Sequence, residues 1–167
     1  MTTRNDCPYG PRAALCPVPA QRVPAAGARQ RAYLELAALA SSASQARRHV
    51  RDALARWGLS HVADDAELIA SELVTNAITA SAALPFRAAV GLLVAAQPGR
   101  VFVMVWDASH KRPVLPGQSD DAVTGRGLAI VAAMSASWGW VPDARGKVVW
   151  AVVDLEDPAE QQAPQAS

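Results

Sequence analysis

The sequence predicts an α+β fold, a two-layer sandwich in which helices cover one face of a mostly antiparallel sheet. Three observations predict it. Apolar side chains recur at helical spacing in three segments, and apolar runs bounded by turn residues mark the strands. The chain has 167 residues, of which 51% are hydrophobic. It is therefore long enough to bury one core without disulfides or a structural metal.

The first elements have recognisable start and stop signals. Residues 33–36 alternate in polarity and predict a short edge strand. Ser42 or Ser44 is a suitable N-cap for the helix that follows, which extends to about Trp57 and ends at Gly58.

A second helix and a strand pair follow. Asp64 and Asp65 open the helix, which extends to about Ser81 before Pro85. Strands are predicted over residues 87–96 and 100–107, because the Gln-Pro-Gly sequence between them favours a turn.

The last third combines a long loop with compact elements. Residues 108–124 are polar and contain prolines, and loops of this length in a compact domain are usually functional or disordered. An apolar helix is predicted over residues 128–135, and a hairpin over 137–141 and 147–155. The three histidines are too scattered for a metal triad, so we assign them no role.

The two ends of the chain differ in composition from its centre. Residues 1–28 hold five prolines, which lack a backbone donor, so we expect a flexible arm. Residues 157–167 are rich in Gln, Ala and Pro, and we expect a disordered tail. The folded domain is expected over residues 29–156.

Composition excludes several classes of protein. Lys and Arg number 16 against 15 Asp and Glu, so no basic excess supports direct nucleic-acid binding. Cys7 and Cys16 are too few for a disulfide framework. No apolar run reaches the roughly 18 residues of a membrane span, and the polar first residues disfavour a secretory signal. We expect a cytoplasmic protein with no membrane or nucleic-acid partner.

The second helix is the most informative segment. One face is apolar, and the opposite stripe is polar and contains Asp65, Glu72, Thr75, Asn76 and Thr79. Glu72 and Asn76 project together because they are four residues apart. An ordinary solvated face explains this stripe too, but such faces usually carry Lys or Arg, and none occurs between Ala66 and Pro85. The acids, amide and hydroxyls of this stripe offer oxygen ligands with no Lys or Arg among them, and Mg²⁺ prefers oxygen ligands.

Two further features follow in the chain. Asp107 ends a strongly apolar strand, which indicates a pocket mouth, although a simple strand-end Asp is common. Gly125 and Gly127 precede a helix, where backbone N–H groups approach phosphates. A plain helix-entry turn explains the glycines equally well.

The order of these features resembles that of the GHKL (Bergerat-fold) ATPases. Residues 72–77, Glu-Leu-Val-Thr-Asn-Ala, resemble the N box of that family. Residues 105–107 and 124–128 resemble its two glycine-box segments, and 146–150 its last hairpin. The branch most similar is that of the bacterial anti-sigma-factor serine/threonine kinases. The resemblance implies the Bergerat ATP-binding fold and covers roughly residues 34–154.

The resemblance implies a role for each matching residue. Asn76 would hold the Mg²⁺ that bridges the phosphates of ATP, and Glu72 would be the general base or the acid that positions a water. Asp107 would accept a hydrogen bond from the adenine amino group. Residues 108–124 would form a lid over ATP. The second glycine-box segment would contact the phosphates through Thr124, Gly125, Arg126, Gly127 and Leu128. Lys111 and Arg126 lie near enough in sequence to neutralise phosphate charge, although a solvated surface position explains both equally well.

This sequence departs from the family pattern at three places. Residues 108–111 lack the glycines that follow the Asp in the wider superfamily, and residues 79–81 lack the basic residue or His of the kinase branch. Val148 stands where a Thr often supports adenine binding.

The implied function is regulatory phosphotransfer. The substrate would be a serine or threonine of an anti-sigma-factor antagonist, or the protein would bind a sigma factor directly. A non-catalytic nucleotide-binding interaction module is the alternative, and a homodimer remains open. A histidine-kinase fragment is disfavoured, because His49 and His61 do not have the setting of a phosphoacceptor.

Overall fold

The computed structural model describes residues 25, 27–82, 84, 88–113 and 126–155. The predicted arm and tail lie almost wholly outside these residues. In chain order the elements are β1 (Gln30–Ala37), α1 (Ser42–Arg56), a 3₁₀ turn η2 (Ser60–Val62), α2 (Ala63–Ser81), β2 (Ala89–Gln97), β3 (Arg100–Asp107), α3 (Arg126–Met134), β4 (Ser137–Asp143) and β5 (Gly146–Asp154).

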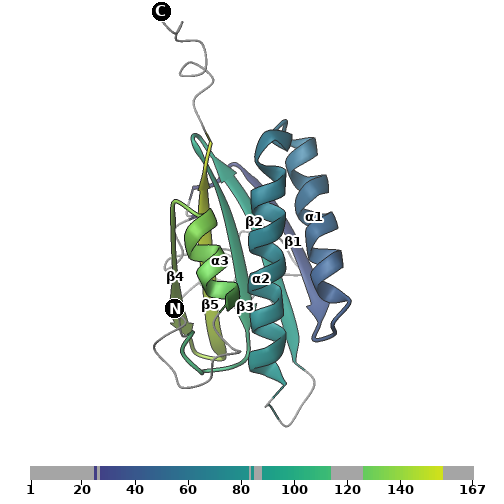
Figure 1. The fold of residues 1–167 in the computed structure, drawn as a ribbon, viewed down its shortest axis with the longest axis vertical. Helices are drawn as coiled ribbons and strands as arrows, with labels where there is room; N and C mark the ends of the chain where they lie inside the picture. The colour runs from purple at the N-terminus through teal and green to yellow at the C-terminus, as the bar shows by residue number, and fades with distance from the viewer. Residues whose placement is uncertain (1–24, 26, 83, 85–87, 114–125, 156–167) are drawn as a thin grey trace, which may run out of the picture.

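The strands form one sheet in the order β1-β2-β3-β5-β4, and every neighbouring pair is antiparallel. The three α-helices lie on the same face of this sheet (Figure 1). The described part of the chain is therefore a two-layer α+β sandwich, which confirms the fold class that the sequence predicts.

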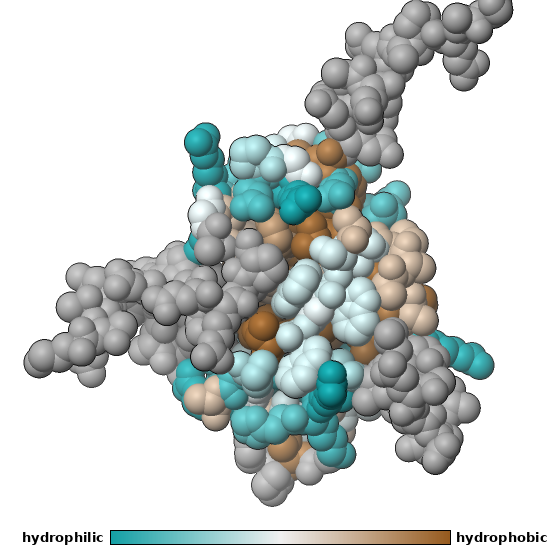
Figure 2. All heavy atoms as spheres, turned by 90° about the vertical axis from the view of Figure 1, so that its left-hand side faces the viewer, coloured by the Kyte–Doolittle hydropathy of each residue, from teal (hydrophilic) through white to brown (hydrophobic). Residues whose placement is uncertain are grey.

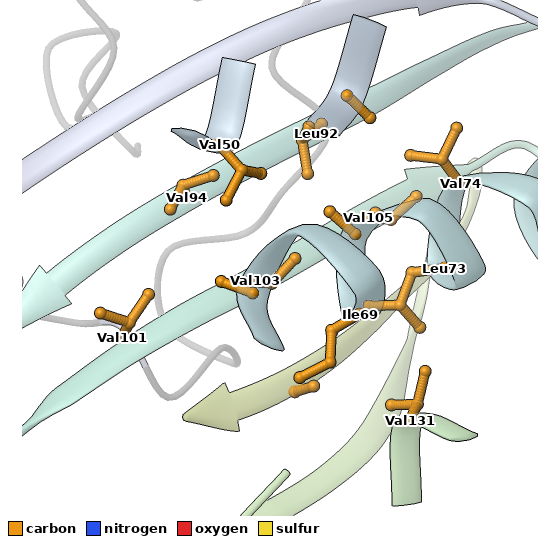
Figure 3. Close-up of a cluster of buried hydrophobic side chains, with 14 of the residues drawn as sticks. Val50, Ile69, Leu73, Val74, Leu92, Val94, Val101, Val103, Val105 and Val131 are labelled. Atoms are coloured by element: carbon orange, nitrogen blue, oxygen red, sulfur yellow. The ribbon is translucent and has the colours of Figure 1, made fainter. Parts of the chain in front are cut away.

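The main core lies between α2 and the centre of the sheet. In Figure 3, Ile69 and Leu73 of α2 face Val103 and Val105 of β3, with Val131 of α3 beside them. All five side chains are at most 2% exposed, and each contributes roughly 1.5–3 kcal/mol by leaving water. This packing confirms the predicted apolar face of the second helix and holds its polar stripe away from the sheet.

The opposite face of the sheet is also apolar. Leu93, Phe102, Met104, Val148 and Val152 are buried there and form a second cluster. Trp106 and Trp150 pack against them.

The outer edge of the sheet is formed by β4. Trp138 and Trp140 are half-buried and pack against the main core, as expected for packing residues rather than a ligand cage. Figure 2 shows this side of the molecule, where a pale band of intermediate hydropathy crosses the face between hydrophilic groups.

The start of α1 differs from the prediction. The N-cap residue is Ser41, and its side chain forms no capping bond. The hydroxyl of Ser42 donates to the carbonyl of Ala37 (2.6 Å), and that of Ser44 to the carbonyl of Ser41 (2.8 Å). The capping prediction is wrong because both hydroxyls bond backwards to carbonyls instead of accepting from the first turn. Gly58, at φ +74°, ends the helix as predicted.

Other boundaries shift by a few residues. The first strand is longer than predicted, because all eight residues of β1 pair with β2. The third helix begins at Arg126, two residues early, and β5 begins at Gly146.

One salt bridge and one further side-chain hydrogen bond join α1 to α2. Arg51 donates two hydrogen bonds to the carboxylate of Glu67 (2.6 and 2.7 Å), and Arg47 donates one to the hydroxyl of Ser71 (3.1 Å). Glu67 is buried, so this bidentate pair is stronger than an exposed one. The sequence of α2 lacks Lys and Arg after Ala66, but arginines of α1 contact the side of α2 that holds Glu67 and Ser71.

Candidate functional site

The second half of α2 meets the start of α3 at the polar stripe. A Cβ on Gly127 would lie 2.6 Å from Glu72 Oε2 and 3.3 Å from both amide atoms of Asn76. No side chain larger than hydrogen fits there without a shift. The structure therefore brings together three residues of the two predicted motifs, which are up to 55 residues apart in the chain.

The amide of Asn76 has an unsatisfied donor. Its Nδ2 is buried and has no hydrogen-bond partner within the described part of the chain. An unpaired buried donor typically costs about 1–3 kcal/mol, and functional sites are one reason for which such groups persist. An acceptor such as a phosphate oxygen would satisfy this donor.

Glu72 and Glu67 are both acidic residues of α2, but they differ in their ion pairing. Glu67 is paired with Arg51, whereas no Lys or Arg within the described residues forms an ion pair with Glu72. The carboxylate of Glu72 is half-buried and lies against Gly127. It can accept a proton from, or orient, a hydroxyl group placed at the start of α3.

The two threonines of the polar stripe do not join this group. Thr75 donates its hydroxyl to the carbonyl of Ser71 (2.7 Å), and Thr79 to that of Thr75 (3.0 Å). Both side chains are exposed. Within the polar stripe, Glu72 and Asn76 are therefore the candidate functional residues. The two threonines belong to the ordinary exposed surface of the helix.

Asp107 lies at the end of β3, on the helix-facing side of the sheet. It continues the row of Val101, Val103 and Val105, which pack against the helices. Its side chain is 1% exposed, so it is not at an open pocket mouth. Figure 1 shows that β3 ends, α2 ends and α3 begins at the same end of the molecule.

A lysine that the sequence analysis missed is bonded to this carboxylate. Lys147 Nζ lies 2.7 Å from Asp107 Oδ1 and 3.1 Å from the carbonyl oxygen of Ser109. The N–H of Ser109 also donates to Oδ1 (2.8 Å). Burial raises the pKa of Asp107 above its ordinary value, and the bond from Lys147 opposes that rise.

Val148, which stands where the family often has a Thr that supports adenine binding, faces away from the helices. It belongs to the apolar cluster on the far side of the sheet, while its neighbour Lys147 faces the site. A lone Lys at an inward position of an otherwise apolar strand is the signal that identifies it.

A family model for the histidine kinase-like ATPase domain matches residues 36–153. This chain belongs to the histidine kinase-like ATPase family. No curated protein matches the chain. Membership of this family, which is part of the GHKL superfamily, supports ATP binding. None of the described helices is long and apolar enough to cross a membrane.

Two parts of the candidate site in this ATPase domain differ in their fit to a nucleotide. At the α2–α3 end, the unpartnered donor of Asn76 and the close approach of Gly127 suit phosphate oxygens and a hard cation. At the end of β3, Lys147 already donates to one oxygen of the Asp107 carboxylate, Oδ1. Among the described residues, no cluster of three His, Cys, Asp or Glu forms a metal site of the protein alone.

Other predicted site residues of the ATPase domain are only partly described. Arg126 is exposed and Leu128 is buried in the core, whereas Thr124 and Gly125 lie outside the described residues. The predicted lid is described only over 108–113. There Arg112 lies over the ring of Trp140 at 5.8 Å, and Lys111 is exposed.

Proposed function

We propose that this protein is an ATP- and Mg²⁺-dependent serine/threonine protein kinase of the anti-sigma-factor type. Its family supports ATP binding. The observation that carries the finer proposal is the buried, unpartnered Nδ2 of Asn76 beside Glu72 and Gly127. A donor, an oxygen ligand and a carboxylate meet there, and no Lys or Arg of the described residues forms an ion pair with that carboxylate.

The residues at this end have complementary chemistry. Asn76 would hold Mg²⁺ through Oδ1 and donate from Nδ2 to a phosphate oxygen. The first backbone N–H groups of α3 would bind phosphate, because a helix N-terminus favours negative charge. Bound ATP supplies the phosphoryl group. Glu72 would accept the proton of the attacking hydroxyl, so the protein contributes mainly positioning and charge.

The partner is proposed from the motif resemblance. The phosphorylated residue would be a serine or threonine of an anti-sigma-factor antagonist. The protein that this chain holds or releases would be a sigma factor. Such partner switching would regulate transcription without contact between this chain and nucleic acid.

A variant of Glu72 separates binding from chemistry. Glu72→Ala is expected to bind Mg·ATP as the wild type does and to lose phosphotransfer to candidate antagonists. Thr79→Ala, on the same helix with its hydroxyl bonded to its own backbone, should retain both. Unchanged phosphotransfer by Glu72→Ala would remove this residue from the catalytic mechanism.

A non-catalytic nucleotide-binding interaction module is the second candidate. The observation that favours it is the bond between Lys147 and Asp107, which occupies one end of the site. Nucleotide binding by the wild type without phosphotransfer to any antagonist or sigma factor would favour this alternative.

A further inference from the structure

The side of the sheet that is turned away from the helices is buried at its centre. Leu93, Phe102, Met104, Val148 and Val152 are at most 4% exposed there, although none of the described helices lies over them (Figure 1). We call this side of the sheet the far face. Because apolar side chains at the centre of an uncovered sheet would meet water, their burial requires a further layer of chain.

The chain enters the far face just before β1. Ala25 is 6% exposed and belongs to the apolar cluster of that face. The N–H of Ala28 donates to the carbonyl of Ala25 (3.1 Å), and Nη2 of Arg31 donates to the same carbonyl (3.2 Å). Gly27, at φ +92°, lies inside this turn. The residues that precede Ala25 are therefore attached to the chain at the far face.

The other end of the described chain lies on the opposite side of the sheet. Leu155 packs against the main core, between the helices and the sheet, and its N–H donates to the carbonyl of Gly99 (2.8 Å). The segment that follows Leu155 thus starts from the helix-facing side. Of the two ends of the chain, the N-terminal one is placed to cover the far face.

The far face carries aromatic side chains and an indole donor that lacks an acceptor. Trp106 and Trp150 are half-buried and pack against the apolar cluster. The Nε1 of Trp106 is buried and has no hydrogen-bond partner within the described residues. Because an unpaired buried donor is costly, this indole calls for a carbonyl acceptor in the layer that covers it.

We propose that residues 13–24 of this chain bind the far face as an extended strap of polyproline II conformation. This segment, Ala-Ala-Leu-Cys-Pro-Val-Pro-Ala-Gln-Arg-Val-Pro, contains three prolines and one charged residue. Polyproline II segments bind aromatic side chains, and their carbonyl groups make no internal hydrogen bonds. One of these carbonyls would accept from the indole of Trp106. The inference does not depend on nucleotide binding.

The segment is long enough to cover the face. At about 3.1 Å per residue, residues 13–24 extend roughly 37 Å from Ala25. The face measures about 13 Å along β3 from Phe102 to Trp106 and roughly 20 Å across the five strands. The strap can therefore pass from Ala25, over the apolar cluster, to the indole of Trp106.

A spin label at the start of the segment tests the inference in the whole chain. Arg12→Cys, with serine in place of both native cysteines, provides a single labelling site. We expect the label to broaden the indole N–H resonances of Trp106 and Trp150 strongly, and that of Trp57 little, because Trp57 follows α1 on the helix-facing side. Equal broadening of all three indoles, or of none, would overturn the inference.

A variant of the segment tests its apolar contacts. Leu15→Asp/Val18→Asp/Val23→Asp, carrying the same label, should lose most of the broadening at Trp106, since a carboxylate without a partner is unfavourable in an apolar layer. Retained broadening in this variant would overturn the inference. Should the variant fail to fold, the comparison of Trp106 with Trp57 in the unsubstituted segment still decides the question.

The matched control places the same charges outside the strap. Thr2→Asp/Thr3→Asp/Asn5→Asp should keep the broadening at Trp106 unchanged, because these residues precede the segment. Loss of broadening here as well would mean that added negative charge, and not the apolar contact, releases the chain, and would overturn the inference.

A mixing experiment separates the strap from a second copy of the chain. Isotope-labelled protein without a spin label, mixed with spin-labelled protein, should show no broadening at Trp106. Broadening in the mixture would assign the cover to the segment of another copy and overturn the inference. A dimer in sedimentation whose Trp106 and Trp150 are not broadened by the label of the same chain would overturn it too, because the far faces of two copies would then cover each other.

Discussion

The α2–α3 end of the site lies at the same end of the molecule as Asp107, Ser109 and Lys147, which we call the β3–β5 clamp. The two groups satisfy their polar atoms differently. At the first, Asn76 has a buried donor without a partner and Glu72 forms no ion pair within the described chain. At the second, the carboxylate of Asp107 receives two donors. Unsatisfied groups indicate where a ligand is accepted, whereas satisfied ones indicate where a ligand has to displace a contact of the protein itself.

The largest expected effect concerns the stability of the clamp. Lys147→Met leaves the carboxylate of Asp107 buried and unpaired, which should cost about 3–5 kcal/mol of unfolding free energy. Arg100→Met breaks only the exposed pair and should cost less than about 1 kcal/mol. Urea denaturation of both variants checks this difference. Equal losses would mean that the clamp is no stronger than a surface ion pair.

The next effect concerns binding at Asn76. Asn76→Ala should weaken Mg·ATP roughly 100-fold, because a bond to a charged group and a metal ligand are lost together. Its fold should be retained, since Asn76 lies on the polar side of α2. Thr79→Ala is the matched control, and calorimetric titration is the measurement. If Asn76→Ala binds Mg·ATP as tightly as the wild type does, the assignment of the phosphate site to the α2–α3 end is wrong.

A smaller effect is expected at the close approach of the two helices. Gly127→Ala would place a Cβ 2.6 Å from Glu72 Oε2, so α3 or Glu72 has to move. Because the nearest atom is the end of a flexible side chain, stability should change little, but the added Cβ also lies 3.3 Å from both amide atoms of Asn76, so Mg·ATP affinity should fall about tenfold. Ala129→Ser, at an exposed position of α3, should bind normally. Full affinity in Gly127→Ala would show that the contact is unrelated to the ligand.

The smallest expected effect concerns the pH dependence of stability at His49, which lies outside both parts of the candidate site. Burial lowers the pKa of His49 below its ordinary value of 6.5. Neutral His49 therefore contributes stability that is present above pH 6.5 and is lost as the pH falls below it, because the unfolded chain then takes up the proton more readily. His49→Gln should flatten the pH dependence of the denaturation midpoint just below pH 6.5. An identical profile for the variant and the wild type would show that another group controls this range.

The sequence predicts those parts that depend on local periodicity. The helix that begins near Asp64 and Asp65, its apolar face and the projection of Glu72 and Asn76 on the same side follow from the 3.6-residue period. The capping residue of α1 was predicted wrongly, because the Ser42 hydroxyl bonds to a carbonyl at the end of the preceding strand. Boundaries of this kind depend on competition between nearby backbone groups.

The clamp was not predicted for a different reason. Lys147 and Asp107 are 40 residues apart, and their contact depends on the register between β3 and β5. Neither the period of two nor the turn residues determine which residues of distant strands lie opposite one another. The approach of Gly127 to Glu72 is likewise a tertiary contact between two helices, for which the motif resemblance gave only the order of the parts.

The central claim is that the α2–α3 end accepts a nucleotide phosphate together with Mg²⁺. Titration of the wild-type protein with ATP, in Mg²⁺ and again with the Mg²⁺ chelated by EDTA, tests it most directly. The account predicts saturable binding of one ATP per chain in Mg²⁺, weakened about tenfold or more by the chelator, because Asn76 then loses the cation that links it to the phosphates. Absence of binding in Mg²⁺, or equal affinity under both conditions, would contradict it.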